Sequence, residues 1–141
     1  MPALARSFKN QNYSAMSAER NPVGWFEIYV DDMARAQRFY ETVFNVKLQA
    51  LDSPVIKMLA FPMKGDLPGC PGALVKMPGG GRPAGNAVII YFTCADCATE
   101  AARAAQNGGK IFKEKFSIGQ YGFIALVHDT EGNMIGLHSR S

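Results

Sequence analysis

The pattern of elements in this chain occurs twice, and that repeat restricts its fold more than any other feature. Residues 23–32 (V-G-W-F-E-I-Y-V-D-D) alternate like a strand, and a helical pattern follows over 32–44. Residues 86–96 (N-A-V-I-I-Y-F-T-C-A-D) read as a second strand, followed by a helical pattern over 96–107. Each half continues in short strand-like runs. The sequence therefore predicts two βαβββ modules that pair around a cavity, where a small ligand can bind.

Local signals predict the remaining elements. Asn45 is a suitable left-handed stop for the first helix, and Gly108-Gly109 for the second. Residues 78–86 (P-G-G-G-R-P-A-G-N) precede no G-K-[ST], so we interpret them as a connector and not as a phosphate loop. We expect one domain over 21–141, with modules at about 22–77 and 86–139, a linker at 78–85, and further strands at 46–51, 55–62, 73–77, 111–116, 122–128 and 134–139.

The first predicted strand has two distinct faces. Trp25, Glu27 and Tyr29 share one face, which we expect to line the cavity because it holds a carboxylate. The opposite face is purely apolar and should pack on helices; it carries Phe26, Ile28 and Val30. In the helix that follows, apolar residues fall at helical spacing and predict a buried stripe of Met33, Ala36, Phe39, Tyr40 and Val43.

Length and charge exclude several classes of function. The 141 residues carry a net charge of +3, and Arg6, Lys9 and Arg20 against Glu19 contribute +2 of it. The sequence therefore has no basic patch of the kind that binds nucleic acid or an anionic membrane, and we expect neither partner. No apolar run approaches the roughly 20 residues that span a bilayer.

The start of the chain is polar and aperiodic. We expect residues 1–20 to be a disordered tail, and a start of translation at Met16 fits the sequence equally well. The tail has no continuous apolar segment typical of a secretion signal, and the three cysteines are an odd number. These features favour a reduced, cytoplasmic protein.

From Pro22 to Ser139 the chain resembles the vicinal oxygen chelate superfamily, which includes glyoxalase I, bleomycin-resistance proteins and extradiol dioxygenases. The matching pieces are W-F-E-I-Y-V-D-D-M-A-R-A-Q-R-F-Y-E-T-V-F, I-I-Y-F-T-C-A-D, Q-N-G-G-K-I and G-F-I-A-L-V-H-D-T-E-G-N-M-I-G-L-H-S. The resemblance implies an α+β fold in which tandem βαβββ modules form an eight-stranded, partly open sheet around a cavity. It also implies a homodimer.

The resemblance further implies four strand positions at which metal-dependent members carry His, Gln or Glu. They fall here at Trp25, near 73–75, at Ile89 and at Gly136, and none holds such a residue. A divalent metal needs several nitrogen or oxygen donors at one point. We therefore expect no metal and no other cofactor, which argues against glyoxalase I and extradiol dioxygenase activity.

Three polar residues are candidates for catalysis. Glu27 lies two residues past the first of these positions and His138 two past the last, so the resemblance implies that they meet in or beside one pocket. Together they would form an acid–base couple or a polar anchor for ligand; the alternative is a structural hydrogen bond or a pair at a dimer interface. Tyr121, in F-S-I-G-Q-Y-G, either donates a hydrogen bond to ligand or packs as a loop aromatic.

Aromatic and soft apolar side chains are candidates for ligand binding. Aromatic walls suit a planar, apolar or cationic ligand, although the same side chains also fill ordinary cores. The expected lining comprises Trp25, Tyr29, Met58, Ile89 and Tyr91. The C-x-x-C motif at Cys94 and Cys97 lacks the flanking residues of thioredoxin-like motifs, so we do not expect a redox or zinc site there.

Three functions remain open from the sequence. The leading hypothesis is a metal-independent protein that binds a small organic molecule in the sheet cavity without breaking a bond. The second is a lyase or isomerase that uses Glu27, with His138 or Tyr121, for proton transfer. The third is a non-catalytic interaction or regulatory module. Saturable binding without turnover would support the binding protein. Turnover that is lost in Glu27→Gln would support the enzyme, and a cavity too filled to admit a ligand would support the non-catalytic module.

Overall fold

The computed structural model describes residues 20–141. The predicted tail, apart from Arg20, and the alternative start at Met16 lie outside the described residues. Two α-helices, α2 (Met33–Phe44) and α3 (Cys97–Gln106), accompany the short 3-10 helices η1 (Pro83–Gly85) and η2 (Gly119–Tyr121). The strands are β1 (Val23–Tyr29), β2 (Gln49–Ala50), β3 (Lys57–Ala60), β4 (Gly72–Lys76), β5 (Val88–Thr93), β6 (Lys110–Ser117), β7 (Phe123–His128) and β8 (Met134–Ser139).

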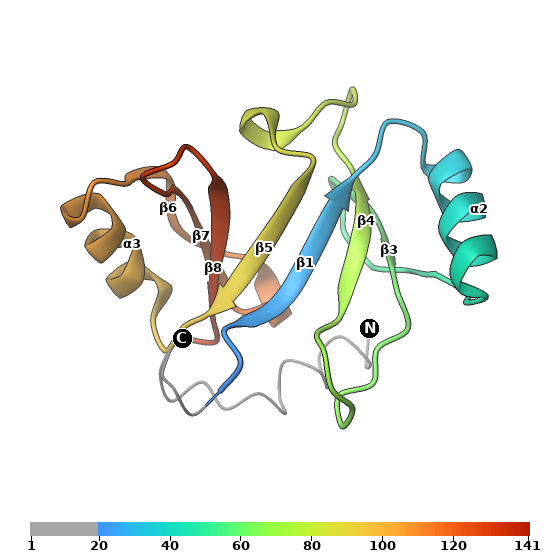
Figure 1. Cartoon of the computed structure of the whole chain (residues 1–141), viewed down its shortest axis with the longest axis horizontal. Helices are drawn as coiled ribbons and strands as arrows, with labels where there is room; N and C mark the ends of the chain where they lie inside the picture. Colours follow the sequence, from blue (N-terminus) through green and yellow to red (C-terminus); the bar gives the residue numbers. More distant parts are fainter. Residues whose placement is uncertain (1–19) are drawn as a thin grey trace.

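These eight strands form one mixed sheet in the order β2-β3-β4-β1-β5-β8-β7-β6. The first strand of each half pairs in parallel with the last, β1 with β4 and β5 with β8, and the halves meet where β1 and β5 pair antiparallel. The sheet is not closed, because β2 and β6 remain as its edges. Figure 1 shows β6 at one side of the sheet and β3, the neighbour of β2, at the other. The predicted α+β class and eight-stranded, partly open sheet are confirmed.

Side-chain caps fix the helix boundaries. The carboxylate of Asp32 accepts the Arg35 N–H at 2.9 Å, and that of Asp96 accepts the Ala98 N–H at 3.0 Å. Asn45 ends α2 with φ 51° and ψ 51°, the left-handed conformation predicted for it. Several strands are shorter than the sequence suggested; β2, for example, spans two residues.

Both helices lie to the sides of the sheet and leave its centre bare (Figure 1). Helix α3 packs on β6, β7 and β8, whereas α2 packs on β4. On the helix-bearing face of β5, Val88 and Ile90 are therefore exposed, at 49% and 38%. The apolar face of β1, predicted to pack on helices, is only partly buried at Phe26 and Ile28, because neither helix reaches the centre.

The predicted buried stripe of α2 is wrong. No residue of α2 is buried, and Phe39 and Val43 are 58% and 56% exposed. Tyr40 anchors the helix, with its ring edge-on to Phe61 at a centroid distance of 5.6 Å. The helical period is correct, but the surface that faces α2 is too narrow to cover the stripe.

No helix in the described part of the chain is both long enough and apolar enough to cross a membrane.

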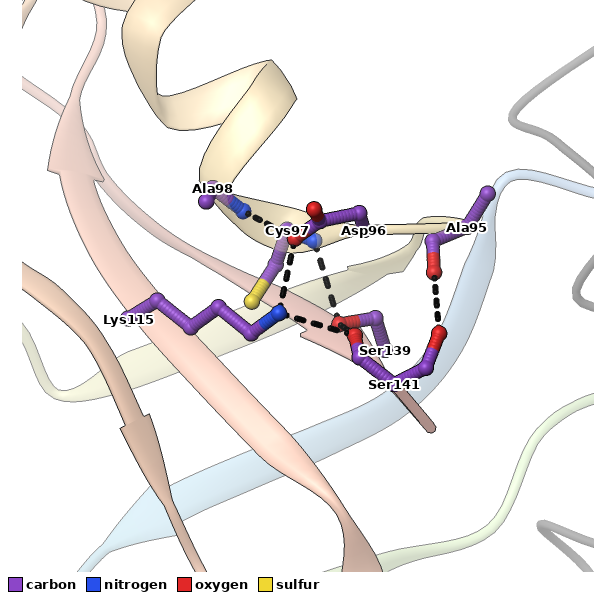
Figure 2. Close-up of polar contacts among 7 residues, drawn as sticks. All are labelled: Ala95, Asp96, Cys97, Ala98, Lys115, Ser139 and Ser141. Atoms are coloured by element: carbon purple, nitrogen blue, oxygen red, sulfur yellow. Dashed lines mark hydrogen bonds and ion pairs between the residues drawn. The ribbon is translucent and has the colours of Figure 1, made fainter.

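The end of the chain is tied to the first turn of α3 (Figure 2). The Ser139 hydroxyl accepts the buried Cys97 N–H at 3.0 Å and donates to the Ser141 carbonyl at 2.9 Å. Lys115 donates to the carboxylate of Asp96 at 2.8 Å and to the same Ser141 carbonyl at 2.9 Å. These bonds hold the end of β8 against α3 and so fix the strand that borders β5.

Replacing Ser139 by Ala tests this attachment. The Cys97 N–H would lose its acceptor while remaining buried, so we expect the free energy of unfolding in urea to fall by about 1–3 kcal/mol. The matched control is Thr130→Ala, which removes a hydroxyl whose hydrogen bond to Glu131 is exposed. Equal stability of the two variants would contradict a structural role for this contact.

Candidate functional site

The sheet face opposite the helices, which we call the inner face, carries a buried cluster. Strand alternation places every second residue of β1 and β5 there, as the sequence predicted for Trp25 and Tyr29. Met58 and Tyr121 are partly buried and pack against the cluster. Its buried members are Trp25, Tyr29, Ala73, Val75, Ile89, Tyr91 and Met134.

Strand register places the residues around Glu27 in two adjacent rows of the inner face. Trp25 pairs with Tyr91, which pairs in turn with Gly136. In the next row, Glu27 lies between Ala73 on β4 and Ile89 on β5. The four positions at which the resemblance implied metal ligands thus belong to adjacent rows, around Glu27.

Glu27 is held by three hydrogen-bond donors from the same face. Its Oε1 atom accepts the Tyr29 hydroxyl at 2.6 Å and the Tyr91 hydroxyl at 3.0 Å. Its Oε2 atom accepts the Trp25 indole N–H at 3.2 Å. Glu27 itself is only 9% exposed. We call these four residues the Glu27 cluster; it joins three alternate residues of β1 to one residue of β5.

Burial and hydrogen bonding act in opposite directions on the pKa of Glu27. Burial raises the pKa of Glu27 above its usual 4.5, although the hydrogen bonds from Tyr29, Trp25 and Tyr91 oppose this shift. Within the described residues Glu27 forms no ion pair. Burial, followed by the charge of Glu27, also raises the pKa of Tyr29 and of Tyr91, so both phenols remain donors.

Gly136 makes room for this arrangement. A Cβ atom at position 136 would overlap the ring of Tyr91, its neighbour on β5. Any side chain there, including a metal ligand, would displace the ring that donates to Glu27. Glycine inside a strand often marks such a close approach, so Gly136 itself is the sequence signal for this contact.

His138 lies away from Glu27. It is 4% exposed, and its Nε2 atom is 2.6 Å from the Tyr121 carbonyl oxygen, so Nε2 must carry the proton. Burial lowers the pKa of His138, which favours the neutral ring. His138 pairs with Thr93, whereas Glu27 pairs with Ile89 on the other side of β5. Four residues along a strand span roughly 13 Å, so the expected acid–base couple does not form.

The residues around Glu27 do not fit a metal ion. In residues 20–141, no group of three or more His, Cys, Asp or Glu side chains is arranged so that it could hold a metal ion. Of the four implied positions, Trp25 offers only a donor, Gly136 has no side chain, and both Ile89 and residues 73–75 (Ala, Leu, Val) are apolar.

The C-x-x-C motif is buried and is not a reactive thiol pair. Cys94 and Cys97 are both 0% exposed, and both are free thiols. Burial, together with the nearby charge of Glu100, raises the pKa of Cys94 to about 12. Burial also raises the pKa of Cys97. Both side chains therefore remain protonated near neutral pH and pack in the core under α3.

Comparison with known proteins identifies relatives across most of the chain. Residues 23–137 match the family described as the Glyoxalase/Bleomycin resistance protein/Dioxygenase superfamily. The chain is 28% identical over 125 residues to a glyoxylase-like domain-containing protein of Didymella fabae, covering 84% of this chain and 93% of that protein.

Solved structures share the fold at low sequence identity. One is a variant of Streptomyces coelicolor methylmalonyl-CoA epimerase in complex with 2-nitronate-propionyl-CoA (TM-score 0.60, 18% identity, 83% of this chain and 92% of that chain). Another is methylmalonyl-CoA epimerase from Mycobacterium tuberculosis (TM-score 0.62, 13% identity, 93% of each chain). At such identities the likeness concerns the fold alone.

The raised pKa of Glu27 predicts a pH-dependent stability difference between the wild type and Glu27→Gln. Between the unfolded pKa near 4.5 and the higher folded pKa, the folded state binds more protons than the unfolded state. The free energy of unfolding of the wild type should therefore fall relative to Glu27→Gln as pH rises through this window. Urea titrations at a series of pH values measure the difference.

The matched control is Glu114→Gln, at an exposed position of β6. Its stability difference from the wild type should not show this fall. A Glu27→Gln difference that is constant, or that moves in favour of the wild type with rising pH, would mean that the carboxylate is not penalised by burial.

Proposed function

Because this chain belongs to the Glyoxalase/Bleomycin resistance protein/Dioxygenase superfamily, we propose that its inner face binds a small organic molecule without the help of a metal ion. The Glu27 cluster carries this proposal. It combines a buried carboxylate, three aromatic side chains and no ion-pair partner among the described residues. The side chains at the four implied ligand positions lack metal-binding atoms, which supports metal independence. The ring of Tyr91 also occupies the space that a side chain at position 136 would need.

The geometry of the carboxylate indicates what the ligand presents. A carboxylate has about four acceptor positions, and Glu27 uses two at Oε1 and one at Oε2. The remaining position, at Oε2, suits an N–H or O–H group of the ligand. A cationic donor would gain most, because it supplies the missing countercharge and because Trp25, Tyr29 and Tyr91 offer aromatic surfaces.

A second candidate function is proton transfer by Glu27. A carboxyl group with a raised pKa exchanges protons more readily near neutral pH, which general acid–base catalysis requires. A lyase or isomerase of this kind would use Glu27 without His138, whose partner position on β5 is four residues away. The fold shared with enzymes named epimerases is compatible with this class.

Three matched probes test the binding proposal: benzylamine, benzyl alcohol and benzoate, each titrated at pH 7 and followed by amide NMR shifts. We expect benzylamine to shift the inner-face amides saturably, benzyl alcohol to bind more weakly and benzoate weakest of all. Glu27→Gln should weaken benzylamine binding at least tenfold, whereas Glu114→Gln should leave it unchanged.

Two results would contradict the proposal. The first is benzoate binding as tight as benzylamine binding. The second is a Glu27→Gln variant that binds benzylamine as tightly as the wild type does. If none of the probes shifts an inner-face amide, the third hypothesis from the sequence, a non-catalytic interaction module, replaces both proposals.

We also propose that two copies associate through the bare centre of the helix-bearing face. Val88 and Ile90 of β5 are exposed there, and Phe26 and Ile28 of β1 lie beside them, partly exposed. A second copy of the chain can cover this patch with the same patch of its own, as a two-fold dimer requires. The α3 and α2 helices on either side would frame the contact.

Analytical ultracentrifugation tests the dimer. We expect the wild type to sediment at twice its 15.3 kDa mass, and Ile90→Asp to sediment as a monomer because it places a charge in the contact. The control is Val55→Asp at an apolar position that is 71% exposed elsewhere, which should remain dimeric. A wild type that is monomeric at every concentration, or an Ile90→Asp variant that is still dimeric, would overturn this proposal.

The cytoplasmic location remains a proposal. Three free thiols, at Cys70, Cys94 and Cys97, fit a reducing compartment.

A further inference from the structure

We propose that this protein has a second binding site, for a phosphate or carboxylate group, between Lys57 and Lys76. The site lies where β3 begins and β4 ends, beside the connector between the two modules. It is separate from the carboxylate of Glu27, and the inference does not rest on the function proposed above.

A cavity is present at this place. Its volume is about 200 Å³, enough for a small anion and part of the molecule that carries it. Among the described residues that line it, the two lysines are the charged ones. The lining residues are Val55, Lys57, Lys76, Met77, Pro78 and Gly79.

The two lysines are held together by the sheet. Lys57 and Lys76 are direct partners in the antiparallel β3–β4 ladder, so their side chains leave the same face at neighbouring positions. Like charges placed directly opposite one another destabilise a strand pair. An anion between the two ammonium groups would turn this repulsion into attraction.

Nearby carboxylates do not neutralise the pair. Asp31 is engaged by Arg82, whose guanidinium is 3.1 Å away. Asp32 caps α2, and its pKa is lowered mainly by the hydrogen bond from the Arg35 backbone N–H. The charge of Lys76 is a smaller cause, after the charges of Arg35 and Arg38. In the described part of the chain, neither Lys57 nor Lys76 forms an ion pair. The cavity therefore keeps a positive charge that a ligand can use.

The glycine turn leaves the cavity open. Gly79 has φ 75°, a left-handed conformation that favours glycine, and a Cβ atom there would meet nothing within 4 Å. A ligand can thus approach the backbone closely at this point. The turn is not a phosphate loop, since no G-K-[ST] follows, and the lysines supply the charge.

Thermal unfolding of the full chain at pH 7 tests the site, with sodium phosphate compared with sodium chloride at equal ionic strength. We expect phosphate to raise the melting temperature saturably, because it binds the folded state. Lys57→Met and Lys76→Met each remove one charge and keep an unbranched stem. Without phosphate, each should melt at or above the wild-type temperature, because the repulsion is gone; with phosphate, each should lose the rise.

The control is Lys64→Met, at an exposed lysine outside the cavity, which should keep the full phosphate response. An acetate titration separates the two ligand groups: a phosphate response alone assigns a phosphate site, and an equal acetate response that both cavity variants lose assigns a carboxylate site. The proposal is overturned if sodium chloride reproduces the rise, or if the two cavity variants respond as the wild type does.

Discussion

The burial of the Glu27 carboxylate is the constraint on which the inner face depends. An ionised carboxylate removed from water is costly unless donors replace its hydration, and here Trp25, Tyr29 and Tyr91 supply them. Two of these donors come from the same strand, but Tyr91 must reach across from β5. Its ring can do so only because Gly136, its neighbour on β8, has no side chain. One polar group thus explains the residue choice on three adjacent strands.

The architecture brings these strands together through the central pairing of β1 with β5. Because each module pairs its first and last strands in parallel, β4 and β8 flank this centre on either side. The helices cover only the outer parts of the opposite face (Figure 1). The same arrangement therefore produces a polar group surrounded by aromatic side chains on one face and a bare apolar patch on the other. We propose that a ligand binds at the polar group and that a second copy of the chain covers the apolar patch.

Much of this could be predicted from the sequence, because it depends on local periodicity. Alternation along β1 placed Trp25, Glu27 and Tyr29 on one face, and the left-handed stop predicted at Asn45 marked the end of α2 correctly. Long-range geometry could not be predicted in this way. Alternation gives the face of His138 but not its distance from Glu27, which is set by register along β5. Helical spacing likewise gives the apolar stripe of α2 but not the width of the surface that it meets, so Phe39 and Val43 were misplaced.

The most direct test of this account is the pKa of Glu27, measured by ¹³C NMR of its carboxyl carbon in the wild-type protein. The account predicts a titration midpoint above the usual value of 4.5, because burial without an ion-pair partner disfavours the charged form. A midpoint at or below 4.5 would mean that the hydrogen bonds or an unrecognised cation outweigh burial, and it would contradict the central claim that Glu27 is a buried carboxylate whose charge no ion pair balances.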